Sequence, residues 1–102
     1  MRVSLPNAPS ALSIADIVPS AAAALGVRGF VDAIGLGQPK HVVCVLVDGL
    51  GSRQLAQYAT YAPVLASLTG PAAATVIPST TPVALGSFGT GMMPGTHGLV
   101  GA

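Results

Sequence analysis

Apolar side chains gather in two short runs, each followed by a polar residue that opens a helical pattern. The longer run, residues 41–47 (HVVCVLV), lies between a glycine-rich turn at 35–40 and Asp48. A short aliphatic run rich in β-branched residues and bounded by turn residues predicts a strand buried on both faces. A second, shorter strand is predicted at 72–77 (AAATVI).

The first third of the chain has a helical pattern. Ser10 can cap a short helix, and Pro19 can open a second one over an alanine-rich stretch that Gly26 stops, with the pattern continuing over 30–34. We therefore expect residues 1–39 to form a helical lead-in to the main domain.

The residues after the first strand decide between a hairpin and a helix. An Asp-Gly pair such as Asp48-Gly49 can form a two-residue hairpin turn, but Leu55 and Tyr58 follow at helical spacing without strand alternation. The sequence thus favours a βα unit, with a further short helix over 61–68.

Thr81 stands where the second strand meets a helix. Pro82 suits the first helical position, so Thr81 is predicted to be the N-cap of a helix over 83–88 that residues 89–91 end. The N-terminus of a helix stabilises an oxyanion, and a hydroxyl there is a candidate nucleophile. The alternative is that Thr81 only caps the helix.

The fold class predicted from these elements is α/β with a parallel sheet, over a domain at 40–102. Asp48 and Thr81 would then emerge at the same carboxyl edge, where ligands of open α/β sheets bind. A divalent metal between them would activate the hydroxyl, and a carboxylate is an accepted zinc ligand. The alternative for Asp48 is a simple turn residue.

Composition narrows the classes of function. Only 7% of residues are charged and 51% are hydrophobic, with a net charge of +1. So little charge indicates either a membrane protein or the interior portion of a larger protein. No uninterrupted apolar stretch is long enough to span a membrane, so the second interpretation is favoured. The absence of a basic cluster gives no nucleic-acid footprint. No signal-peptide core is evident, so we expect a cytoplasmic protein.

The histidines and the cysteine are left out of the predicted site. His41 lies at the wrong end of its strand, and His97 lies in a proline-glycine turn, where a hydrogen-bonded histidine is expected rather than a metal ligand. Cys44 has no partner for an internal disulfide and is expected to be a packed thiol.

Four segments resemble the beginning of the nucleotide pyrophosphatase/phosphodiesterase family of the alkaline phosphatase superfamily. Their order and spacing agree over roughly 40–102. The segments are VLVDGLG at 45–51, YAPVLASL at 61–68, PSTTPVALGSFGTG at 78–91 and MPGTHGLVG at 93–101.

The resemblance implies an alkaline-phosphatase-like fold and a phosphate-ester hydrolase that uses two zinc ions. It assigns Asp48 to the first metal-binding aspartate. The spacing to Thr90-Gly91 gives the nucleophile role to Thr81 rather than Thr80, and Thr81 would also bind zinc. The implied substrate is a small-molecule phosphate ester or a nucleotide, attacked to form a phosphothreonine intermediate.

Two departures limit what this chain is expected to do. Many family members carry an asparagine three residues after the nucleophile, where this sequence has Ala84. The later metal ligands of the family have no counterpart before Ala102, so we expect an incomplete domain, inactive without its missing C-terminal part. The alternatives are a non-catalytic α/β interaction module or remnant, and a phosphonate or phosphomonoester hydrolase of the same superfamily.

Overall fold

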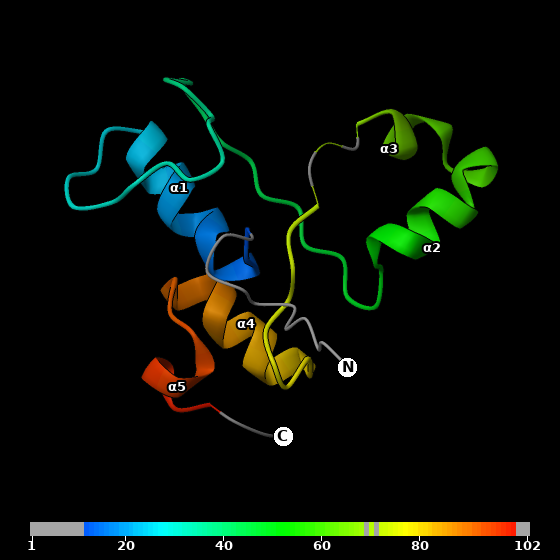
Figure 1. Cartoon of the computed structure of the whole chain (residues 1–102). Helices are drawn as coiled ribbons and strands as arrows, with labels where there is room; N and C mark the ends of the chain where they lie inside the picture. Colours follow the sequence, from blue (N-terminus) through cyan, green and yellow to red (C-terminus); the bar gives the residue numbers. More distant parts are fainter. Residues whose placement is uncertain (1–11, 69, 71, 100–102) are drawn as a thin grey trace, which may run out of the picture.

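The computed structural model describes residues 12–68, 70 and 72–99, and helices dominate this part of the chain (Figure 1). The elements are η1 (Ile14–Asp16), α1 (Ile17–Ala24), α2 (Ser52–Gln57), η2 (Ala59–Tyr61), α3 (Pro63–Ser67), α4 (Thr81–Thr90) and α5 (Pro94–His97). The predicted helices after Asp48 and after Thr81 are therefore present, with α3 inside the short helix predicted near 61–68.

The first helical stretch begins at a capping box. Ser13 Oγ accepts a hydrogen bond from the N–H of Ala15 at 3.2 Å, and Asp16 Oδ2 accepts one from the N–H of Ser13 at 2.8 Å. Pro19 lies within the first turn of α1, where its missing N–H costs nothing. The prediction that Pro19 opens a second helix is wrong, because η1 continues directly into α1. The predicted cap Ser10 lies outside the described residues.

The residues after α1 form a loop, so the prediction that helix continues over 30–34 is also wrong. Gly26, at φ 90°, turns the chain out of the helix. The Asp32 carboxylate then accepts hydrogen bonds from the N–H groups of Gly35 at 2.8 Å and Gly37 at 3.2 Å. Desolvation acts to raise the pKa of Asp32, but these backbone hydrogen bonds outweigh it and hold the pKa below its ordinary value.

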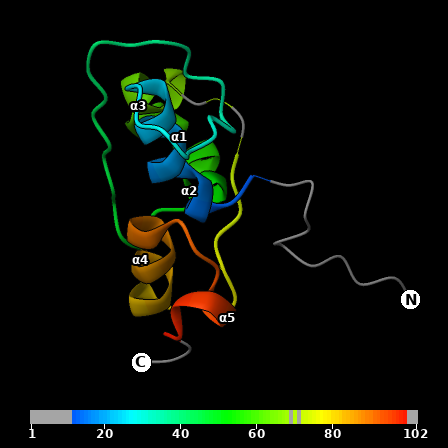
Figure 2. The same ribbon diagram turned by 90° about the vertical axis from the view of Figure 1, so that its left-hand side faces the viewer.

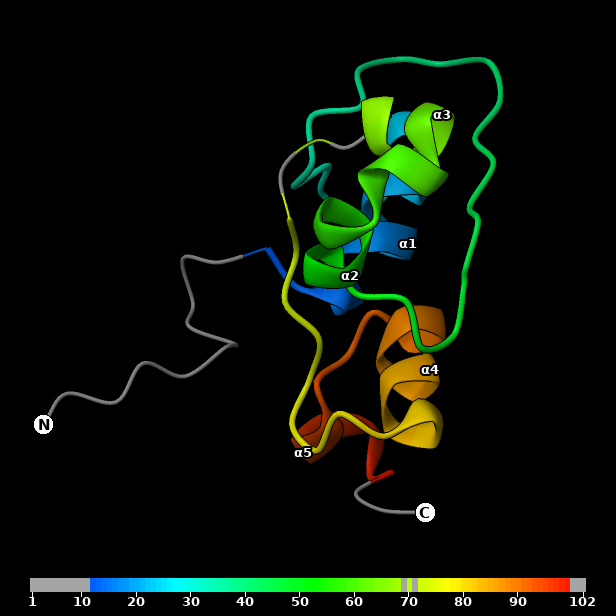
Figure 3. The same ribbon diagram turned by 90° about the vertical axis from the view of Figure 1, so that its right-hand side faces the viewer.

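Neither predicted strand forms within the described ranges, and the expected parallel sheet is not found there. Residues 41–47 are extended without pairing to another described segment. Side chains predicted to be buried are exposed, Val43 to 84% and Val45 to 82%. Figures 2 and 3 show residues 41–47 (green) and 72–76 (yellow) running along opposite sides of the molecule.

The second predicted strand segment pairs with the residues at the start of η1. The N–H of Ala74 donates to the Leu12 carbonyl and the N–H of Ile14 donates to the Ala74 carbonyl, each at 2.8 Å. These bonds make an isolated parallel bridge between Ser13 and Ala74. A single bridge is not a ladder, and among the described residues no strand lies paired beside residues 41–47.

The core lies where α4 packs against η1 and α1. Its buried side chains are small: the apolar ones are Ala15, Ala24, Val76 and Val83, and the polar ones are Ser13, Ser20 and Ser87. Gly91 ends α4 in the left-handed conformation, φ 69°. A Cβ on Gly91 would lie 2.5 Å from Cγ of Pro19, so glycine allows the end of α4 to pack directly on α1.

A part-buried hydrogen bond joins α5 to α4. Ser87 Oγ lies 2.8 Å from Nε2 of His97, and the N–H of Leu99 donates to Nδ1 of His97 at 3.0 Å. Because a backbone N–H can only donate, Nδ1 is the acceptor, and the proton of the neutral ring is on Nε2. His97 therefore donates to Ser87, and both of its ring nitrogens are engaged, as expected for a structural histidine.

The remaining helices, α2, η2 and α3, lie to one side of this core (Figure 1). Tyr58, between α2 and η2, and Tyr61, at the end of η2, have ring centroids 6.4 Å apart, and their ring planes are tilted relative to each other. Within the described ranges, no helix combines the length and the apolar character needed to cross a bilayer.

Replacing Ser87 by alanine should lower the free energy of unfolding by about 0.5–1.5 kcal/mol, because the ring Nε2–H of His97 loses its acceptor, Ser87 Oγ. Urea denaturation followed by circular dichroism measures the change. Ser67→Ala removes an exposed hydroxyl that bonds the Val64 carbonyl, and this control should change stability by about 0.5 kcal/mol or less. Equal losses in the two variants would contradict a stabilising contact between α4 and α5.

Replacing Val45 by lysine should reduce self-association, because an extended, exposed and uncharged segment is a template for pairing between chains. Sedimentation velocity measures the loss of oligomers. The control is Val64→Lys. Val64 is also exposed but lies in α3, so this variant adds the same charge away from residues 41–47 and should have little effect. An equal reduction in both variants would show that net charge, rather than this segment, controls association.

Candidate functional site

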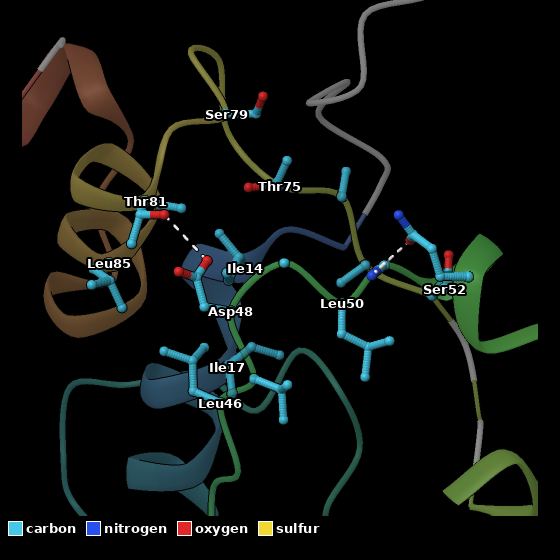
Figure 4. Close-up of a pocket in the computed structure, with 18 residues that line it drawn as sticks. Ile14, Ile17, Leu46, Asp48, Leu50, Ser52, Thr75, Ser79, Thr81 and Leu85 are labelled. Carbon is cyan, nitrogen blue, oxygen red and sulfur yellow. Dashed lines mark hydrogen bonds between the residues drawn. The ribbon is translucent and has the colours of Figure 1, made fainter. Parts of the chain in front are cut away.

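Asp48 and Thr81 lie together on the wall of one cavity. Thr81 Oγ1 donates a hydrogen bond to Asp48 Oδ1 at 3.2 Å (Figure 4). The two residues are 33 positions apart in sequence, and both side chains are exposed. The sequence argument brought them to one edge of a sheet, whereas in the described part of the chain they meet without a sheet.

Asp48 occupies the turn that follows the extended residues 41–47. Gly49, at φ 73°, turns the chain towards α2, and the N–H of Gly51 donates to Oε1 of Gln54 at 2.9 Å as α2 begins. The side-chain hydrogen bond found for Asp48 crosses to Thr81 instead of closing its own turn. The carboxylate is thus presented to the cavity.

Thr81 is the first residue of α4, and the prediction that it is the N-cap is wrong by one position. Thr80 is the N-cap, since it has an extended backbone and its carbonyl accepts the first helical hydrogen bond from the N–H of Ala84 at 2.9 Å. Pro82 is then the second helical residue and needs no donor there. Because Thr81 does not cap the helix, its hydroxyl is available to bind Asp48.

The cavity beside this pair has a volume of about 820 Å³, within the range of small-molecule sites. Its polar lining consists of Asp48, Ser52, Gln54, Thr75, Ser79 and Thr81, and the other lining residues are aliphatic or glycine. Sequence reasoning missed the hydroxyls of Thr75 and Ser79. The sequence offered one signal for them. Both lie shortly before Thr81, near the end of the predicted second strand, and ligands of α/β sheets bind at strand ends.

The donor atoms at this contact are one carboxylate and one hydroxyl oxygen. A carboxylate oxygen is a ligand that Zn²⁺ accepts, and the hydroxyl oxygen of Thr81 lies beside it, 3.2 Å from Asp48 Oδ1. The described ranges contain no group of three or more His, Cys, Asp or Glu side chains placed to hold an ion.

The other candidate residues lie away from this site. His41 and Cys44 are exposed, and neither lines the cavity around Asp48. The prediction of a packed thiol is wrong, because the strand that would have covered Cys44 is not formed. His97 is held against α4 by its hydrogen bonds to Ser87 and Leu99.

Comparison with known proteins identifies the family. Neither the curated proteins nor the solved structures give a match to this chain. The family model described as type I phosphodiesterase / nucleotide pyrophosphatase matches residues 42–102, which is more than half of the chain and includes both Asp48 and Thr81. The chain therefore belongs to the type I phosphodiesterase / nucleotide pyrophosphatase family.

Proposed function

We propose that this chain carries the nucleophile and one metal ligand of an enzyme that hydrolyses phosphate diesters. The observation that supports the proposal is the contact between Thr81 Oγ1 and Asp48 Oδ1 on the wall of a cavity. Membership of a family of phosphodiesterases agrees with it. An alkaline-phosphatase-like domain built on a parallel sheet is part of the same proposal.

The geometry favours Thr81 over Thr80 as the nucleophile. The Thr81 hydroxyl is oriented by its hydrogen bond to Asp48, and Thr81 lines the cavity, whereas Thr80 is not among the lining residues. The N-terminus of α4 adds a positive partial charge beside the reacting hydroxyl, which favours the anionic oxygens of a phosphoryl group. Ser79 offers a further hydroxyl from the cavity wall.

In this proposal Asp48 and Thr81 would hold Zn²⁺ through Oδ1 and Oγ1. When bound, the ion lowers the pKa of a coordinated hydroxyl and neutralises charge that develops on phosphoryl oxygens. A catalytic zinc normally has three protein ligands. We therefore propose that further donors complete the site, and that the 102 residues alone do not turn over substrate.

The proposed reaction has two displacements at phosphorus. Thr81 Oγ1 loses its proton and forms a bond to phosphorus, while the bond to the leaving oxygen breaks with its electron pair and that oxygen gains a proton. Water then attacks the phosphothreonine, and Thr81 regains its hydroxyl as the phosphate monoester leaves. Asp48 holds the Thr81 oxygen in place at the start and end of the cycle.

Thr81→Ala should reduce hydrolysis of bis-p-nitrophenyl phosphate by on the order of 10³-fold or more, because the attacking oxygen is removed. The assay uses the polypeptide extended through its downstream reading frame, with added Zn²⁺. The matched control Thr80→Ala should keep most of the activity. If Thr80→Ala is the inactive variant, the roles of the two threonines are exchanged. Turnover by the 102 residues alone would contradict the incompleteness of the site.

Asp48→Asn should weaken Zn²⁺ binding at least tenfold, because the amide replaces an anionic donor with a neutral one. Isothermal titration calorimetry on the 102-residue chain measures the affinity. Asp32→Asn is the matched control, since that carboxylate lies in the loop after α1, away from the cavity. Equal affinities for the two variants would remove Asp48 from the metal site.

The hydrolysis assay also distinguishes the alternative function. If no polypeptide extended beyond residue 102 hydrolyses the diester, a non-catalytic module is favoured, with the exposed residues 41–47 as its contact surface.

A further inference from the structure

Residues 41–47 form an extended apolar segment at the surface whose backbone is unpaired. Among the described residues, none forms a backbone hydrogen bond with this segment. Val43 and Val45 are 84% and 82% exposed, and Figure 3 shows the segment (green) along one edge of the molecule. The segment contains no proline. Each of its residues therefore offers an N–H and a carbonyl group to a neighbouring strand.

The residues that flank the segment carry opposite charges. Lys40 comes directly before it and Asp48 directly after it, and no Asp, Glu, Lys or Arg lies between them. Both flanking side chains are exposed. Lys40 and Asp48 are equally far from Cys44 along the chain. When two copies lie antiparallel with Cys44 opposite Cys44, Lys40 of each copy is therefore opposite Asp48 of the other.

This charge pattern selects both the orientation and the register of such a pair. Opposite charges directly across two strands stabilise the pair, and like charges destabilise it. A parallel pair in register would place Lys40 beside Lys40 and Asp48 beside Asp48. An antiparallel pair shifted along the segment would move both charges out of opposition. Only the antiparallel register centred on Cys44 joins opposite charges at both ends.

The same register matches the apolar side chains. It places Val43 opposite Val45, and Val42 opposite Leu46, of the second copy. β-branched side chains pack well against neighbours on a pleated surface. The central strand pair is therefore apolar on both faces, and its two ends are closed by ion pairs.

We propose that residues 41–47 are an interface between two copies of this chain, paired as antiparallel strands about a two-fold axis at Cys44. The interface uses the same surface on both copies, so it closes as a dimer. Asp48 accepts a hydrogen bond from the Lys40 ammonium of the second copy through Oδ2, while Oδ1 keeps its bond to Thr81. One strand pair is smaller than a standard interface of about 1,600 Å², so dimer and monomer exchange. The pairing does not rest on the proposed hydrolysis.

Cys44, at the two-fold axis, supplies the first test. Residues directly opposite each other in an antiparallel pair have Cα atoms about 4.5–5.5 Å apart, within the range of about 4.4–6.8 Å that a disulfide needs. Diamide removes two electrons and two protons from a pair of thiols as the S–S bond forms. Treating the 102-residue chain with diamide should therefore give a covalent dimer, followed by non-reducing electrophoresis.

Two matched variants separate this register from random collision. Both carry Cys44→Ser, and one adds Val43→Cys while the other adds Val45→Cys, at two highly exposed positions. Each new thiol is about 7–8 Å from its own copy in the proposed pair, so either variant alone should cross-link about tenfold more slowly than the original chain. An equimolar mixture should regain most of the rate, because residue 43 then faces residue 45. Equal rates for all three single-cysteine chains would overturn the proposal.

The flanking charges give an independent test by sedimentation velocity at low ionic strength. Lys40→Asp should raise the dissociation constant of the dimer about tenfold, because like charges then meet at both ends. Arg28→Asp makes the same change of charge in the loop after α1 and should have little effect. Mixing the Lys40→Asp chain with an Asp48→Lys chain should restore dimers, since every end again joins opposite charges. If the original chain is monomeric at every concentration, or if Arg28→Asp acts as strongly as Lys40→Asp, the proposal is wrong.

Discussion

The position of Thr81 depends on the buried face of α4. Val83 and Ser87 are fully buried one turn apart on this helix, against η1 and α1 and in contact with His97. Packing along this face limits the rotation of α4 about its axis, and this orientation places the Thr81 hydroxyl within 3.2 Å of Asp48 Oδ1.

The local elements of this arrangement are readable in the sequence. Pro82 and the glycine at 91 mark the two ends of α4, and turn glycines mark the start of α2, because capping and left-handed termination depend on only a few neighbouring residues. The N-cap was misplaced by one residue because Pro82 was assigned to the first helical position, whereas it is the second residue of α4. Only the tertiary contact to Asp48 distinguishes their hydroxyls.

The hydrophobic pattern does not determine strand pairing, because pairing depends on partners far away in sequence. Residues 41–47 have a composition that suits a buried strand, but composition does not supply a neighbour. The segment before α1 takes the backbone groups of Ala74, and this pairing has no signature in the hydrophobic pattern. The aliphatic cavity wall was unpredictable for the same reason, since it combines η1, α1, α4 and the turn after residue 47.

Sparse charge limits how the proposed site would recognise an anion. Charged residues make up 7% of the chain, and no Lys or Arg is among the described residues that line the cavity. In the proposed function, recognition of phosphate would then depend on the backbone N–H groups at the start of α4 and on the metal ion proposed at Asp48 and Thr81. Because the field of a helix terminus weakens within its first turn, that contribution would act on the phosphoryl group rather than on the ester groups.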